Sequence, residues 1–232
     1  MAQPFLFDGV KRAHSRFSPL PSSRFYRNSK IEQIYLDTVR SYTSEQAENM
    51  SKLLALLISA LEIKYQDFLG QVFSILNLGN GKKGQFFTPY SVSKLMAEIN
   101  IIDIKNQLAD KDFITLSEPC SGSGGIIIAF AESLFEKGYN YQHQLFVEAI
   151  DIDELCFMMT YIQLSLYGIP ARVILGDTLS LKFQRILYTP MYFINGFYWK
   201  LQKERKPEVK KVIQNETLPN PIQLQLFSLS PT

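Results

Sequence analysis

Apolar residues recur every three to four positions over residues 44–78, which predicts a long helical stretch. The repeating positions are Met50, Leu53, Leu54, Leu57, Ile58, Leu61, Tyr65, Phe68, Leu69, Val72, Phe73 and Leu76. A stripe of this kind is typical of a packing surface. Gly70 within it indicates either a close helix contact or a break. Upstream, Ser29 can cap a shorter helix that runs to about Val39.

Farther along the chain the pattern changes to short apolar runs that alternate with amphipathic segments. We predict strands over 113–116, 145–150 and 172–175, and helices over 126–137 and 154–167. Another helix should begin at Thr88-Pro89, with Thr88 as its cap and Pro89 in the first helical position. Strand-helix alternation predicts an α/β fold with a parallel sheet and right-handed crossovers.

Four regions follow from these patterns and from shifts in composition. They are a basic arm over 1–29, a helical region over 30–80, an α/β domain over 81–200, and a linker with a tail over 201–232. The arm carries six cations and no acid between Lys11 and Lys30, with aromatic residues between them. It suits contact with a phosphate backbone, or it is a solvated extension.

Composition narrows the class of protein. Hydrophobic residues make up 46% and charged residues 20%, the profile of a globular chain. Two cysteines and two histidines, without metal-ligand spacing, favour neither a disulfide framework nor a metal site. No signal segment or long apolar run is present, so we expect a cytoplasmic protein with no membrane contact.

The first chemical feature is the glycine-rich turn over 118–125, placed between a predicted strand and a predicted helix. Glycines there allow a sharp turn and a close approach of the backbone to a ligand. Asp151 follows the second strand, where a carboxylate can accept both hydroxyls of a ribose, and Asp153 is a helix cap. Asp177 follows the third strand, where it could accept a hydrogen bond from an adenine amino group. Plain loop packing is the alternative for the turn alone.

The segments Asp67-Phe68-Leu69-Gly70 and Gly84-Gln85-Phe86-Phe87-Thr88-Pro89, followed by the turn, resemble the N6-adenine DNA methyltransferases typified by modification subunits of type I restriction-modification systems. The resemblance covers roughly residues 60–180 and implies a partial Rossmann-like sheet that binds S-adenosylmethionine. The residues it implies for cofactor binding are Phe86, Phe87, Thr88, Pro89, Glu118, Cys120, Gly122, Ser123, Gly124, Asp151, Ile152, Asp177 and Thr178. In that family the Phe-Phe-Thr-Pro stretch helps to hold the methionine end, and Glu118 would face its amino group.

The chain departs from this family at the catalytic motif. The family carries Asp/Asn-Pro-Pro-Tyr/Phe after its fourth strand, where it orients the target amino group and stacks on a flipped base. The nearest substitute here is Asn195-Gly196-Phe197-Tyr198, after the apolar run over 191–194, and it lacks both prolines. Asn195 and Tyr198 are therefore the candidate catalytic residues, and aromatic cover for the sheet is the alternative. Residues 199–232 are too few for three more strands, so we expect a partial sheet in the order 3-2-1-4.

The tail contains a second candidate motif. Gln223, Leu224, Leu226 and Phe227 resemble the peptide that bacterial polymerases and repair proteins insert into the replication sliding clamp. The alternative is a terminal strand that folds back onto the domain.

Two functions from different classes fit these features. One is a DNA adenine-N6 methyltransferase that acts on DNA, with a second subunit for target recognition. The other is a non-catalytic subunit that binds cofactor or DNA and is recruited to the sliding clamp. Methyl transfer to RNA or protein is a third possibility.

Overall fold

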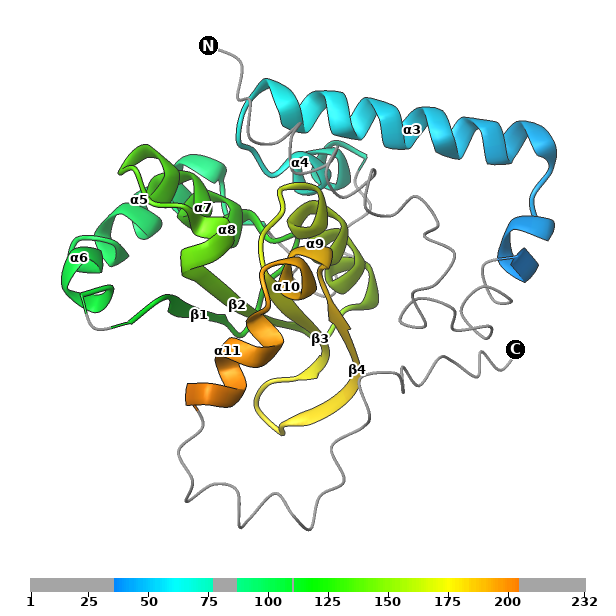
Figure 1. Ribbon diagram of the computed structural model, residues 1–232. Helices are drawn as coiled ribbons and strands as arrows, with labels where there is room; N and C mark the ends of the chain where they lie inside the picture. Colours follow the sequence, from blue (N-terminus) through cyan, green and yellow to red (C-terminus); the bar gives the residue numbers. More distant parts are fainter. Residues whose placement is uncertain (1–35, 77–86, 110, 205–232) are drawn as a thin grey trace, which may run out of the picture.

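The computed structural model describes residues 36–76, 87–109 and 111–204, and its centre is a four-stranded sheet in the order β1-β2-β3-β4 (Figure 1). β1 (Ile114–Glu118), β2 (Leu145–Asp151) and β3 (Ala171–Asp177) are parallel, whereas β4 (Lys182–Tyr188) runs antiparallel to β3. The carboxyl ends of the three parallel strands therefore meet at one edge, where open α/β sheets bind ligands.

Helices cover one face of this sheet. α7 (Gly125–Glu136) follows β1 and α9 (Glu154–Leu166) follows β2, and both contribute to a single core with alternate residues of β2 such as Val147 and Ala149. α5 (Tyr90–Asn100) packs on α7. α3 (Ser44–Ile63) enters the same core through Leu57 and Leu61 near its C-terminal end, and α4 (Phe68–Ile75) follows it. Two short helices, α6 (Ile104–Gln107) and α8 (Tyr141–Gln144), complete this part.

The opposite face has a separate aromatic cluster. Phe146 points away from the main core, because it alternates along β2 with Leu145 and Val147. It stacks on Phe197 at a ring separation of 5.9 Å. Phe197 begins α11 (Phe197–Glu204), which follows α10 (Pro190–Ile194). These two helices therefore cover part of the second face.

The α/β prediction and its three parallel strands are confirmed, with boundaries shifted by one to two residues. The position of the fourth strand was wrong. The run over 191–194 is helical, because Thr189-Pro190 starts α10 there. The fourth strand is instead β4, which pairs with β3 as a hairpin, so the order is β1-β2-β3-β4 rather than 3-2-1-4, and the two outer strands are β1 and β4.

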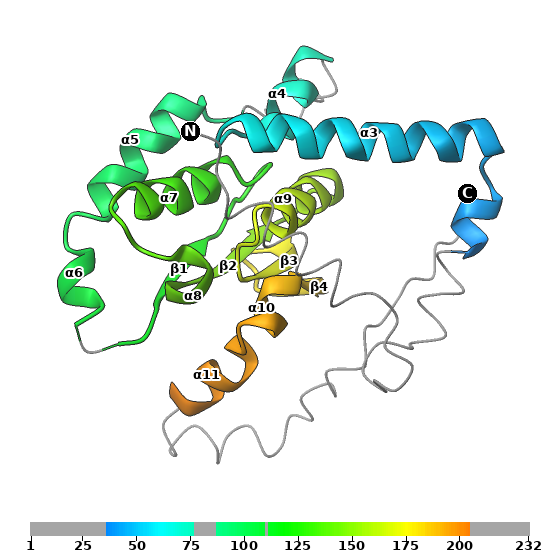
Figure 2. The same ribbon diagram turned by 45° about the horizontal axis from the view of Figure 1, so that its top comes forward.

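The helical region differs from the expectation in two ways, and at Gly70 it agrees with one of the two alternatives. The stretch over 44–78 breaks between Ile63 and Phe68, and Asp67 caps the second helix. Gly70 lies inside α4, where a Cβ would overlap the Asp67 carboxylate, so it marks a close contact. The stripe is buried only in part: Leu53 is 65% exposed, and in both views the N-terminal part of α3 extends beyond the sheet (Figures 1 and 2).

At the start of α5 the cap is Pro89 rather than Thr88, and no side chain caps it. Within the described ranges, none of the helices combines the length and apolarity that a membrane crossing needs.

Candidate cofactor site

The turn after β1 is fixed by its own backbone and by the end of β2. Gly122 and Gly124 have φ angles of 56° and 93°, in the left-handed region that residues with a Cβ atom rarely adopt. The amide of Ser121 donates to the carbonyl of Ile150 (2.9 Å), and the amide of Gly122 donates to Asp151 Oδ2 (2.8 Å). The first two parallel strands are thus joined at their carboxyl ends, and the turn has one defined shape.

Polar residues of α9 support this turn from behind. The Thr160 hydroxyl donates to the carbonyl of Gly122 (2.9 Å). The Gln163 side chain is fully buried, and its Nε2 donates both to the carbonyl of Ser123 (2.8 Å) and to Asp67 Oδ1 (2.8 Å). The side chains of Thr160 and Gln163 therefore both have partners, which offsets the cost of removing them from water.

Asp67 connects the N-terminal helices to the same turn. Its side chain accepts from the amide of Gly70 (3.0 Å), which caps α4, and from the hydroxyl of Ser123. The residue is only 6% exposed, and no cationic side chain of the described residues forms an ion pair with it. A Cβ at Gly125 would lie 3.0 Å from its carboxylate, so any larger residue at the start of α7 would require the Asp67 side chain to shift.

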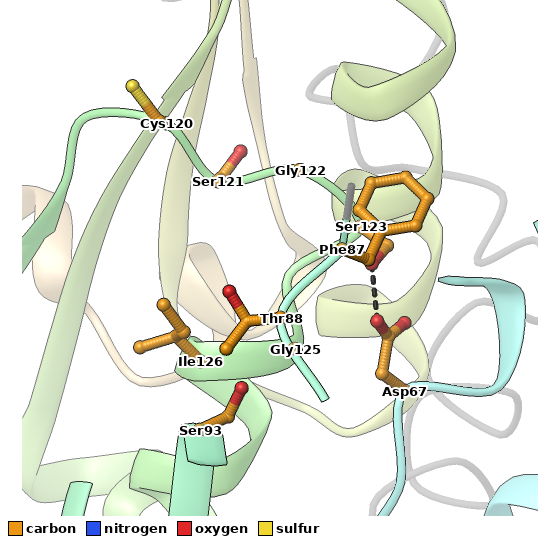
Figure 3. Close-up of a pocket in the computed structure, with 10 residues that line it drawn as sticks. All are labelled: Asp67, Phe87, Thr88, Ser93, Cys120, Ser121, Gly122, Ser123, Gly125 and Ile126. Atoms are coloured by element: carbon orange, nitrogen blue, oxygen red, sulfur yellow. Dashed lines mark hydrogen bonds between the residues drawn. The ribbon is translucent and has the colours of Figure 1, made fainter. Parts of the chain in front are cut away.

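A cavity of about 70 Å³ lies between the turn and the segment before α5 (Figure 3). Its lining residues are Asp67, Phe87, Thr88, Ser93, Cys120, Ser121, Gly122, Ser123, Gly125 and Ile126. The Phe87 ring lies against Gly122, where a Cβ would be 3.1 Å from it, and packs edge-on against Phe73. The lining is rich in hydroxyl groups and contains one carboxylate, that of Asp67, which suits a small polar group with a positive charge.

Two more carboxylates stand beside the turn. Burial raises the pKa of Glu118, the amide of Cys120 opposes this by donating to it (3.2 Å), and the neighbouring charge of Asp151 raises it further. Burial likewise raises the pKa of Asp151, while the amides of Asp153 and Gly122 lower it. Two half-buried acids held this close form an electronegative edge that favours hydroxyl or ammonium donors.

The third strand contributes through the turn that follows it. The Asp177 carboxylate accepts from the Ser180 hydroxyl (2.9 Å) and from the amide of Leu179 (2.9 Å), and these bonds lower its pKa. Thr178 donates to the carbonyl of Pro119 (2.6 Å), which fastens the third strand to the glycine-rich turn. Ile152, which follows Asp151, is 68% exposed at the same edge. These residues lie at the carboxyl ends of β2 and β3, and Thr178 contacts the glycine-rich turn.

The structure does not bring Asn195 and Tyr198 to this edge. Because β4 runs antiparallel, it returns the chain to the amino ends of the parallel strands, where α10 begins. Asn195 Nδ2 donates there to the carbonyl of Gln142, which lies just before β2 (2.5 Å). Tyr198 packs against the aromatic cluster of the second face. Both residues thus contribute to packing in this arrangement.

The cofactor-binding residues expected from the sequence otherwise gather at one place. Phe87, Thr88, Cys120, Gly122 and Ser123 line the cavity, and Pro89 and Gly124 adjoin it as the caps of α5 and α7. Phe86 lies outside the described residues, as do the basic arm and the motif over 223–227.

Four further polar residues belong to this site: Asp67, which the sequence indicated only as part of the family resemblance, and Ser93, Thr160 and Gln163, which were not expected. Asp67 alone had a local signal, since an acid three residues before Gly70 can cap a helix. The other three are spaced along helices and give no such sign.

The fold and this edge define an α/β domain with a glycine-rich turn and acids at successive strand ends, the edge at which open α/β sheets bind ligands. The family model described as N-6 DNA Methylase matches residues 64–215, well over half of the chain. The chain therefore belongs to the N-6 DNA methylase family, whose members use S-adenosylmethionine and act on DNA. Searches of the curated proteins and of the solved structures gave no match.

The two cysteines should react at very different rates with a thiol reagent. Cys120 is exposed beside the cavity, whereas Cys156 is 3% exposed and its pKa is raised to about 12, mainly by burial. At pH 8 we expect iodoacetamide to modify Cys120 first, as mass spectrometry of the peptides would show. The Cys120→Ser variant is the control. Equal rates at both positions would contradict the described burial.

Proposed function

We propose that this chain binds S-adenosylmethionine at the carboxyl edge of its sheet, with the methionine end in the cavity. The observation that carries the proposal is the hydrogen bond from the Gly122 amide to Asp151, which holds the turn against the end of β2 beside a small, hydroxyl-lined cavity. The cavity volume of about 70 Å³ suits the amino-acid end but not the whole cofactor. The ribose and adenine would then lie outside it, toward Asp151 and Asp177.

The chemistry of the residues fits the group. Gly122 and Gly124 leave backbone free for a close approach, and the half-buried carboxylates of Glu118 and Asp151 can accept hydrogen bonds from ammonium or hydroxyl groups. When bound, the cofactor supplies the methyl group for transfer. The chain's own contribution is to orient it and to exclude water behind Phe87.

The change Asp151→Ala should weaken binding of S-adenosylmethionine by about tenfold or more. Losing a charge-assisted pair of ribose hydrogen bonds costs about 1.5–3 kcal/mol. Calorimetry of the full chain measures this effect directly. Asp153→Ala is the matched control, because Asp153 caps α9 and would alter stability without touching the ribose. No binding by the folded wild-type chain would refute the proposal.

We further propose that the chain serves adenine-N6 methylation of DNA together with a partner that supplies target recognition and the missing part of the active site. Family membership supports the reaction class. The need for a partner is supported by the position of Asn195 at the amino edge of the sheet, away from the turn at the carboxyl edge. No segment of the described residues, that of Asn195 included, has Asn or Asp followed by two prolines.

The isolated chain should therefore methylate unmethylated bacterial DNA poorly or not at all. Transfer of a radiolabelled methyl group to DNA, with the chain alone and with products of neighbouring genes, measures this. Robust turnover by the chain alone would contradict the expectation. If that activity vanished in Asn195→Ala while cofactor affinity held, the substitute motif would be catalytic after all.

A non-catalytic role is the second candidate, and the packing role of Asn195 favours it. In that role the chain would carry a cofactor or DNA and reach replicating DNA through its tail. The support for the tail is the spacing of Gln223, Leu224, Leu226 and Phe227 in the sequence.

A labelled peptide of residues 219–232 should bind the bacterial sliding clamp with micromolar affinity. Burial of Leu226 and Phe227 contributes roughly 1.5–3 kcal/mol each, and ordering the peptide offsets part of this gain. Fluorescence polarisation is the measurement, with the double variant Leu226→Ala, Phe227→Ala as control. The same signal from both peptides, or none at tens of micromolar clamp, would count against recruitment.

A further inference from the structure

Ser93 of α5 carries a hydroxyl group that the fold leaves without a partner. The residue is fully buried, and its Oγ makes no hydrogen bond within the described part of the chain. A helical serine commonly donates to the carbonyl four residues earlier. Here the carbonyl of Pro89 accepts from the backbone amides of Val92 and Ser93 instead. A buried hydroxyl with no partner is costly, so its presence calls for an explanation.

The position of Ser93 supplies one. The residue lines the cavity, and Figure 3 shows its hydroxyl pointing toward Thr88 and the interior of the lining. Asp67 lies at a different part of the same lining, where Figure 3 shows it joined to Ser123 by a hydrogen bond. The Ser123 hydroxyl donates to Asp67, so its lone pairs remain available as acceptors. One part of the cavity thus accepts hydrogen bonds next to a negative charge, and another part can donate one.

An amino acid end group has the complementary pattern. Its ammonium would face Ser123 and Asp67, and its carboxylate would lie near the donor at Ser93. We propose that Ser93 is a specificity-determining residue whose hydroxyl donates to the α-carboxylate of the cofactor's amino-acid end. The inference rests on the proposed cofactor function and adds to it a residue that selects ligands carrying an amino acid over plain nucleosides.

Packing alone offers a competing explanation, because a small residue at position 93 lets α5 approach α7. The chain provides a matched control for it. Ser133 on α7 is 1% exposed and its Oγ also has no partner among the described residues, but it does not line the cavity. Ser93→Ala and Ser133→Ala each remove one buried, unpaired hydroxyl and keep the helix contact. Both unliganded variants should therefore melt at or above the wild-type temperature.

The test measures two ligands by calorimetry on the full chain. S-adenosylhomocysteine has the amino-acid end, and 5′-methylthioadenosine has the same nucleoside without it. Ser93→Ala should bind S-adenosylhomocysteine about tenfold more weakly than wild type, the loss of one hydrogen bond to a charged group. Its affinity for 5′-methylthioadenosine should not change, and Ser133→Ala should match wild type for both ligands.

Other outcomes distinguish the role of Ser93 from the proposed cofactor function. If wild type binds both ligands and Ser93→Ala binds S-adenosylhomocysteine equally well, the role of Ser93 is overturned and the cofactor site stands. An equal loss for both ligands would overturn it too, since the hydroxyl would then act through helix packing. If folded wild-type protein binds neither ligand, both the cofactor function and this inference are overturned.

Discussion

The buried carboxylate of Asp67 is the constraint on which the site depends. It accepts from the Gly70 amide, the Ser123 hydroxyl and the Gln163 side chain, which belong to α4, the glycine-rich turn and α9. Three separate parts of the chain are thereby fixed around one charge that is out of water. Removal of the carboxylate would leave several buried donors without acceptors, at about 1–3 kcal/mol for each. The start of α4 is therefore part of the candidate cofactor site rather than an appendage to it.

The antiparallel direction of β4 has the second large effect. In a sheet of parallel strands with helical crossovers, each strand would deliver the following loop to the same edge. The hairpin from Asp177 to Lys182 reverses the chain instead, so the segment after β4 arrives at the amino edge. Asn195 and the aromatic residues near it then complete the packing of the second face. The outer edges of β1 and β4 stay unpaired among the described strands, so each presents backbone groups that no described strand satisfies.

Local sequence was sufficient to identify the three parallel strands. The strands of the parallel sheet are buried on at least one face, so their apolar runs, such as that around Val147, identify them directly. The apolar spacing was less informative where one helix lies partly on the core and partly beyond it. Leu61 of α3 is buried, whereas Leu53 on the same helix is exposed. In α5 the apolar residues face outward and Ala97 faces the core, because close helix contact there requires small residues.

The sequence by itself determined the position of the glycine-rich turn and of Asp151 and Asp177 at strand ends, because each follows directly on a short apolar run. Tertiary structure alone decided which polar side chains lie behind the turn and which segment follows β4. Asp67 and Gln163 are 96 positions apart and meet only when α4 packs on α9. No local pattern encodes such a meeting, since hydrogen bonds between distant residues depend on how helices pack.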